Sequence, residues 1–128
     1  MQLFPKISDA EWEVMKIIWR GNRITSEEII ISLSEKMDWS APTVKTFINR
    51  LHKKGAIGFE KSGRNYIYYP LVSEKDCIRT ERKSFVEKVY DGAVSMLFSN
   101  FIEEEPLSDQ EIERLQKLLE EKKTQRKK

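Results

Sequence analysis

Hydrophobic positions in the first part of the chain follow the spacing of helix faces. Apolar side chains recur three and four residues apart, at Trp12, Met15, Ile18 and Trp19. Ser8 precedes Glu11 by three residues, which is the capping box of a helix start, and Gly21 follows as a stop signal. This pattern predicts a helix over about residues 9–20.

A second helix is indicated by the same start signal. Thr25 and Glu28 repeat the capping-box spacing, and apolar residues continue from there towards Lys36. A short extended piece around Arg23 and Ile24 is expected to separate the first two helices.

The third predicted helix has the most regular pattern. Ser40 can cap it, and Pro42 is tolerated in the first turn, so the Ser40 hydroxyl is expected to bond the amide of Thr43. Gly55 marks its end. One apolar stripe for a core is formed by Val44, Phe47, Ile48 and Leu51.

The next fifteen residues, AIGFEKSGRNYIYYP, alternate strand formers around a turn at residues 62–65. They predict a β-hairpin. Three helices followed by a hairpin within about 65 residues are the plan of a winged helix, a helix-turn-helix with a two-stranded wing. The fold class predicted for the whole chain is therefore mainly α, with an N-terminal winged helix-turn-helix domain over residues 1–72.

The second half lacks strand signals. A helical pattern starts at Ser73, is interrupted near residues 91–92, and is broken by Pro106 before a last helix. About 50 residues cannot enclose so many large apolar groups alone, so a helical dimerisation domain over residues 73–121 is predicted, followed by a disordered basic tail over 122–128. The residues expected to form the dimer contact are Phe85, Val89, Leu97, Phe98, Ile112, Leu115 and Leu119.

Charge is unevenly distributed, although the whole chain carries only +2. The stretch from residue 40 to residue 64 holds six basic residues and a single acid, Glu60. Such a concentration is expected of a surface that meets a polyanion, although a solvated helix face is the alternative for a charge count alone.

The polar face of the third helix favours DNA as that polyanion. Residues near its N-terminal end are expected to enter the major groove, and later cations to contact phosphates, with Arg64 at the wing tip suited to a phosphate or the minor groove. The predicted DNA-binding residues are Ser40, Thr43, Lys45, Thr46, Asn49, Arg50, Lys53, Lys54 and Arg64.

The sequence disfavours metal binding, catalysis and membrane insertion. His52 has no clustered ligand partner and is interpreted as a packed or surface residue, and Cys77 as a small apolar group or surface thiol. No catalytic set is visible, so neither enzyme activity nor a metal or cofactor is expected. No spanning segment or signal peptide is visible either, which predicts a cytoplasmic protein without membrane insertion.

Three segments, ISDAEWEVMKIIW, DWSAPTVKTFINRLHKKG and SNFIEEEPLSDQEIERL, occur in an order that resembles the penicillinase repressor family. That family comprises repressors of β-lactamase and methicillin-resistance genes. The resemblance implies a homodimer on a palindromic operator. It also implies release by cleavage at Asn100-Phe101, after a membrane sensor-transducer detects a β-lactam.

Two alternatives remain open at this point. The copper-responsive relatives of the family carry a cysteine-rich metal hook near the C-terminus, which EEKKTQRKK lacks. A winged-helix protein-interaction module without DNA binding is the alternative from another class, and failure to retard DNA at low salt would favour it.

Overall fold

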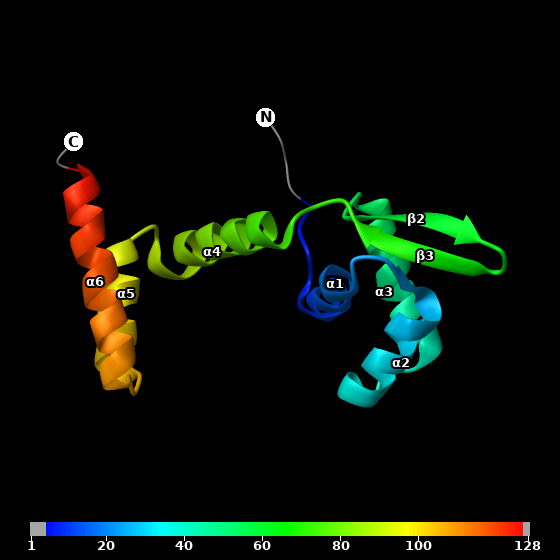
Figure 1. Ribbon diagram of the computed structural model, residues 1–128, viewed down its shortest axis with the longest axis horizontal. Coiled ribbons are helices and arrows are strands. Elements are labelled where there is room, and N and C mark those ends of the chain that lie inside the picture. Colours follow the sequence, from blue (N-terminus) through cyan, green and yellow to red (C-terminus); the bar gives the residue numbers. More distant parts are fainter. Residues whose placement is uncertain (1–4, 127–128) are drawn as a thin grey trace. The chain divides into compact units, whose positions relative to one another are not determined.

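A computed structural model describes residues 5–126. The chain divides into two compact units, one ending at Arg82 and one beginning at Lys83, and each is described by itself. The first unit contains α1 (Asp9–Gly21), β1 (Ile24–Thr25), α2 (Ser26–Met37), α3 (Ala41–Lys53), β2 (Ile57–Ser62) and β3 (Asn65–Pro70) (Figure 1). The helix α4 (Glu74–Tyr90) begins in the first unit, and α5 (Val94–Glu104) and α6 (Asp109–Arg126) belong to the second. The predicted fold class is confirmed.

Side-chain caps begin the helices of the first unit where the sequence predicts them. At α1 the Ser8 amide donates to Glu11 at 2.9 Å, and the Glu11 amide donates to the Ser8 hydroxyl at 3.2 Å. Thr25 and Glu28 form the same box at α2. Ser40 accepts from the Thr43 amide at 3.4 Å, as predicted. These caps satisfy amides that have no partner inside the helix.

The core of the first unit lies where α1, α2, α3 and the start of β2 meet. The apolar stripe of α3 is buried at Val44, Ile48 and Leu51, and Phe47 packs against the cluster from its edge. The members contributed by α1 and α2 are Val14, Met15, Ile17, Ile18, Ile29 and Leu33. Because this stripe faces inward, the polar side of α3 faces outward.

The wing is a hairpin, but the sheet has three strands instead of the predicted two. β2 and β3 pair antiparallel, with Ser62 opposite Asn65 around Gly63 and Arg64. The extended piece after α1 forms β1, which pairs with β3 so that Ile24 lies opposite Tyr68. The short connection between α1 and α2 therefore anchors one edge of the wing to the helices.

The first unit extends further along the chain than the predicted boundary at residue 72. The Trp19 indole donates to the Val72 carbonyl oxygen at 2.9 Å, which ties α1 to the end of the hairpin. Cys77, in the second turn of α4, is 4% exposed and belongs to the core cluster. The start of α4 thus closes the core, so the chain leaves the first unit only after residue 82.

The second unit departs from the sequence prediction at its C-terminal end. The Asp91-Gly92 break between α4 and α5 is confirmed, with left-handed backbone at both residues. The disordered tail, however, is wrong for residues 122–126, which continue α6 to Arg126. Lys, Gln and Arg are good helix formers, so they propagate a helix that is already nucleated. Residues 127 and 128 lie outside the described part.

Candidate DNA-binding surface

The outward side of α3 brings together most of the predicted DNA-binding residues. With its buried stripe fixed in the core, the helix period turns the opposite side chains to solvent. The side chains exposed there are Lys45, Thr46, Asn49, Arg50 and Lys53. The surface they form, here called the α3 face, spans the length of the helix.

Hydroxyl groups at the start of α3 already have partners inside the helix. The Ser40 and Thr43 hydroxyls lie 2.9 Å apart, and the Thr46 hydroxyl donates to the Pro42 carbonyl oxygen at 3.0 Å. Ser40 is therefore foremost a cap. Thr46 keeps its methyl group and its oxygen lone pairs available for an external contact.

The cations of the α3 face have no counter-ion among residues 5–126. Within the part of the chain that the structure describes, Lys45, Arg50 and Lys53 take part in no ion pair. The Arg50 guanidinium lies over the Phe47 ring at 6.0 Å from its centroid, which restrains the guanidinium without neutralising it. The first turn of α3 contains no acidic residue. The α3 face therefore presents uncompensated positive charge.

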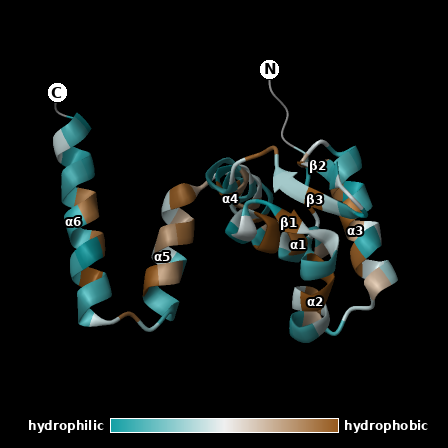
Figure 2. Cartoon of the chain, turned by 45° about the vertical axis from the view of Figure 1, so that its right-hand side comes forward, coloured by the Kyte–Doolittle hydropathy of each residue, from teal (hydrophilic) through white to brown (hydrophobic). Residues whose placement is uncertain are grey.

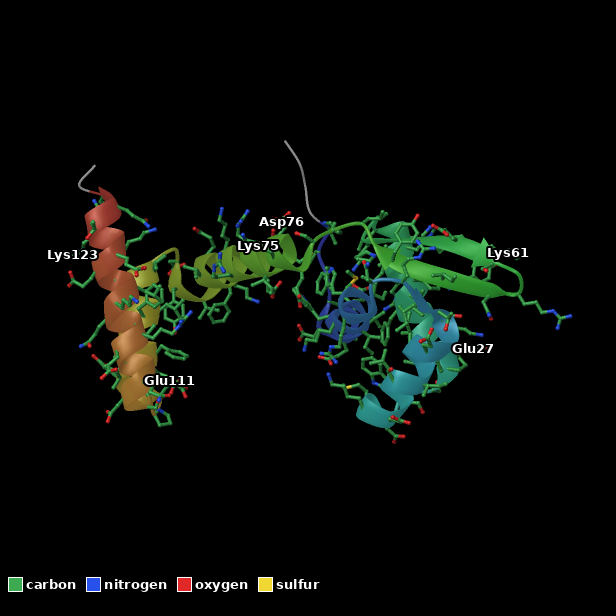
Figure 3. The ribbon with its side chains drawn as sticks, in the orientation of Figure 1. Glu27, Lys61, Lys75, Asp76, Glu111 and Lys123 are labelled. Carbon is green, nitrogen blue, oxygen red and sulfur yellow. The ribbon has the colours of Figure 1, made fainter. Side chains whose placement is uncertain are left out.

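The wing adds to this positive surface because its acid is neutralised. Arg23 forms a bidentate salt bridge with Glu60, with nitrogen to oxygen distances of 3.1 and 2.7 Å. Hydrogen bonds from Arg23, with its charge, hold the pKa of Glu60 below its ordinary value. Lys61 lies near the wing tip (Figure 3), and Arg64 is exposed in the turn. Like the α3 cations, Lys61 and Arg64 form no ion pair within residues 5–126.

Lys54 differs from the other predicted DNA-binding residues. Its ammonium donates to the carboxylate of Glu11 and, at 2.7 Å, to the carbonyl oxygen of Lys6. Both acceptors belong to the segment that begins α1, so the structure engages this cation within the unit. Lys54 is the one predicted DNA-binding cation that the structure places in an ion pair.

Sequence reasoning assigned Glu11 to the capping box and missed its burial. The side chain is 1% exposed. Burial raises the pKa of Glu11, but hydrogen bonds from Lys54 and the Ser8 amide, together with the charge of Lys54, lower it below the ordinary value overall. No local signal in the sequence joins residues 11 and 54, because the contact depends on how α1 and α3 pack.

Exposed apolar side chains dominate the second unit. Neither α5 nor α6 contains a buried residue, and Figure 2 shows hydrophobic residues along both helices. Of the predicted dimer contacts, Leu97 is half-buried and the others are exposed, namely Phe85, Val89, Phe98, Ile112, Leu115 and Leu119. The predicted cleavage site, Asn100-Phe101, lies inside α5 near its end, with Phe101 52% exposed.

A model of the penicillinase repressor family matches residues 7–121. The chain belongs to the penicillinase repressor family. Members of this family are repressors, so the protein is a DNA-binding regulator of transcription and not an enzyme. Separately, none of the helices within residues 5–126 is long and apolar enough to cross a membrane.

Two relatives within the penicillinase repressor family match over nearly their full length. The penicillinase repressor of Bacillus licheniformis is 42% identical over 127 residues, which are 99% of each chain. The methicillin resistance regulatory protein MecI of Staphylococcus aureus strain N315 is 44% identical over 117 residues, covering 91% of this chain and 95% of that protein.

Solved structures of the same family resemble the first unit. The DNA-binding domain of the repressor BlaI in solution is 46% identical, with a TM-score of 0.54, and covers 59% of this chain and 93% of that one. The monomeric form of Bacillus licheniformis BlaI, solved in complex with the blaP half-operator, matches with the same identity and coverage and a TM-score of 0.53.

Proposed function

We propose that this repressor binds a palindromic operator as a homodimer and represses β-lactamase or related β-lactam-resistance genes. The observation that carries the proposal is the α3 face, whose cations form no ion pair with any other residue that the structure describes, in a fold shared with BlaI. BlaI itself was solved on a half-operator, and the two full-length relatives are named for penicillinase and methicillin resistance. A repressor acts where DNA is, so a cytoplasmic location is part of the proposal.

Position along α3 divides the roles of its predicted DNA-binding residues. Thr43, Lys45 and Thr46 lie near the N-terminal end, the part of a recognition helix that meets base edges in winged and other helix-turn-helix proteins. Asn49, Arg50 and Lys53 follow towards the other end, where contacts to phosphates are expected. Arg64 in the wing turn is assigned to a phosphate or the minor groove.

The second unit supplies the dimer contact in this proposal. The exposed apolar residues of α5 and α6 would remain in water in a single copy, which is unfavourable in proportion to the area exposed. Burying them against a second copy joins two α3 faces. A two-fold symmetric dimer then matches half-sites about one or two helical turns apart.

Release of the operator is proposed to follow cleavage of the Asn100-Phe101 bond by a pathway that starts at a membrane sensor-transducer. Cleavage there separates α6 from the rest of the chain, and with it Ile112, Leu115 and Leu119. The test is mass spectrometry of the protein recovered from its source cells. A fragment ending at Asn100 is expected after exposure to a β-lactam. An intact chain that leaves the operator when copper is added would instead favour a copper-type repressor.

The DNA-binding assignment is tested by titrating operator and scrambled duplexes with two variants. Lys45→Ala is expected to weaken the operator complex by about tenfold and the scrambled complex much less, because the lost contact reads a base. Lys53→Ala is expected to weaken both complexes alike and to reduce the salt slope by about 1 for each protomer, about 2 for the dimer, because each protomer loses one phosphate contact.

Equal losses on both duplexes for Lys45→Ala would contradict its reading role. Absence of any retardation by the unaltered protein at low salt would contradict the DNA-binding assignment as a whole. It would favour the protein-interaction module instead.

A further inference from the structure

Glu11 is the one buried charged side chain among the described residues. Taking a carboxylate out of water costs several kcal/mol unless hydrogen bonds and an opposite charge compensate it. Compensation is present here, since Glu11 accepts from the Ser8 amide and from the ammonium of Lys54. The capping-box bond to Ser8 explains a carboxylate at position 11, whereas the bond from Lys54 is an additional contact made outside α1.

The pair joins two places that are 43 residues apart in the chain. Glu11 lies in the first turn of α1, and Lys54 is the residue that caps the C-terminal end of α3. The Lys54 amide donates to the Arg50 carbonyl oxygen at 3.0 Å, so the residue continues the α3 backbone directly. A bond from Lys54 to the Lys6 carbonyl oxygen adds a second tie to the same segment.

These contacts are directional, whereas the apolar stripe of α3 is not. Contacts of the buried Val44, Ile48 and Leu51 hold α3 in the core, but the hydrophobic effect that drives them has no preferred direction. Charged hydrogen bonds restrict the position of the residue that makes them. The tie at Lys54 thus fixes the end of α3 that carries Arg50 and Lys53, and with it the register of the whole α3 face.

We infer that Glu11 is a positioning residue for DNA reading: it holds Lys54, and through Lys54 it sets the orientation of α3 against the operator. The inference rests on the proposed function of the α3 face. It also removes Lys54 from the cations that contact phosphates, which separates Lys54 from its neighbour Lys53.

The test compares four variants of the full chain with the unaltered protein on operator and scrambled duplexes over a series of salt concentrations. The variants are Glu11→Gln, Lys54→Gln, the double variant with both changes, and Lys53→Gln as the matched control. Circular dichroism at the assay temperature selects the variants that remain folded. The double variant keeps the test open if Lys54→Gln, which leaves a buried carboxylate alone, fails to fold.

Glu11→Gln is expected to lower operator affinity by about tenfold while the affinity for scrambled DNA stays the same or rises. The double variant is expected to lose less operator affinity than the sum of the two single losses, because both single changes remove the same contact between Glu11 and Lys54. Removal of the Lys54 charge is expected to leave the salt slope unchanged, whereas Lys53→Gln reduces it by about 1 for each protomer, about 2 for the dimer.

Two results would overturn the inference. One is a loss of affinity that is equal on operator and scrambled DNA for Glu11→Gln, which a general loss of stability would produce. The other is a salt slope reduced by the Lys54 changes as much as by Lys53→Gln. Failure of the proposed function is recognised separately, because the unaltered protein would then show no preference for the operator.

Discussion

At the scale of single residues, the structure separates side chains that share a charge but differ in surroundings. Lys53 and Lys54 are neighbours in the chain, and both were predicted to bind DNA. Lys53 is exposed without a counter-ion among residues 5–126, whereas Lys54 is held by the carboxylate of Glu11. Lys54 differs from Lys53 because the fold places the buried carboxylate of Glu11 beside Lys54 only.

The Glu11 carboxylate predicts how stability depends on pH. Its pKa is lower in the folded than in the unfolded chain, so ionised Glu11 stabilises the fold above the unfolded pKa of about 4.3. This contribution is lost as the pH falls through the lower, folded pKa. Urea unfolding should therefore show that Glu11→Gln costs about 1–3 kcal/mol at pH 7 and progressively less below pH ~4.

A cavity variant provides the control for that measurement. Leu33 is fully buried in the same core and carries no proton that titrates. Leu33→Ala should cost about 2–5 kcal/mol throughout the same pH range. A difference between Glu11→Gln and the unaltered protein that stays constant from pH 7 to pH 3 would contradict the role of the ionised carboxylate.

The close contact between Gly58 and Tyr69 allows a second prediction about stability. A Cβ atom added there would lie 2.8 Å from the Tyr69 ring, so the ring must move from its place beside β2. Gly58→Ala is expected to lower the free energy of unfolding by about 1–3 kcal/mol. Ser62→Ala, in an exposed position of the same strand, is the control and should change it by less than about 0.5 kcal/mol. Equal effects of the two variants in urea unfolding would contradict the steric explanation.

At the scale of elements, the start of α3 combines a structural and an electrostatic role. Ser40 caps the helix, and Asp caps as well as Ser does. Ser40→Ala is therefore expected to cost about 1 kcal/mol of stability, and Ser40→Asp close to none. The order of the operator affinities should be the opposite. Ser40→Asp should bind the operator more weakly than Ser40→Ala, because a carboxylate at the start of α3 repels phosphates. Thermal unfolding measures the stabilities of the two variants, and titration of operator DNA measures their affinities.

The outcome that contradicts this prediction is undiminished operator binding by Ser40→Asp. It would mean that the start of α3 lies away from the phosphates. Reduced stability of Ser40→Asp would instead contradict the capping role alone, so the two parts of the prediction can fail independently.

Helix starts, the α3 stripe and the wing turn could be predicted because each depends on residues within one element. Ser8, Thr25 and Ser40 cap through neighbours three residues away, and the period of α3 places its core residues. Pairing of β1 with β3 and the tie from Glu11 to Lys54 could not be predicted, because they join segments distant in the chain. The α3 face could thus be predicted, whereas the buried partner of Lys54 could not.

At the scale of the whole molecule, the proposed function requires both units: the first binds a half-site, and the second holds two copies together. The first unit encloses an apolar core, whereas α5 and α6 bury none of their residues in a single copy. A dimer held by the second unit turns two weak half-site contacts into one joint contact. Loss of the proposed dimer is therefore expected to weaken operator binding without altering the α3 face.

Ending the chain at Asn100 tests this coupling. The shortened chain retains the entire first unit and lacks α6. Its affinity for a half-site should equal that of the full chain, whereas its affinity for the complete operator should fall by about 10²-fold or more. Sedimentation should show the full chain as a dimer and the shortened chain as a monomer. Similar affinities of both chains for the complete operator would contradict the coupling.

Substitutions in α6 test whether the operator defect of the shortened chain comes from loss of the dimer or from removal of the residues after Asn100. Leu115→Asp places a charge among the exposed apolar residues, and Gln116→Asp adds the same charge at the adjacent polar position. Leu115→Asp is expected to dissociate the dimer and to reproduce the operator defect of the shortened chain, because burying an unpaired carboxylate opposes association. Gln116→Asp should leave both sedimentation and operator binding close to those of the unaltered protein. A full chain that sediments as a monomer while it occupies the operator would show that the two half-sites are held by some other contact.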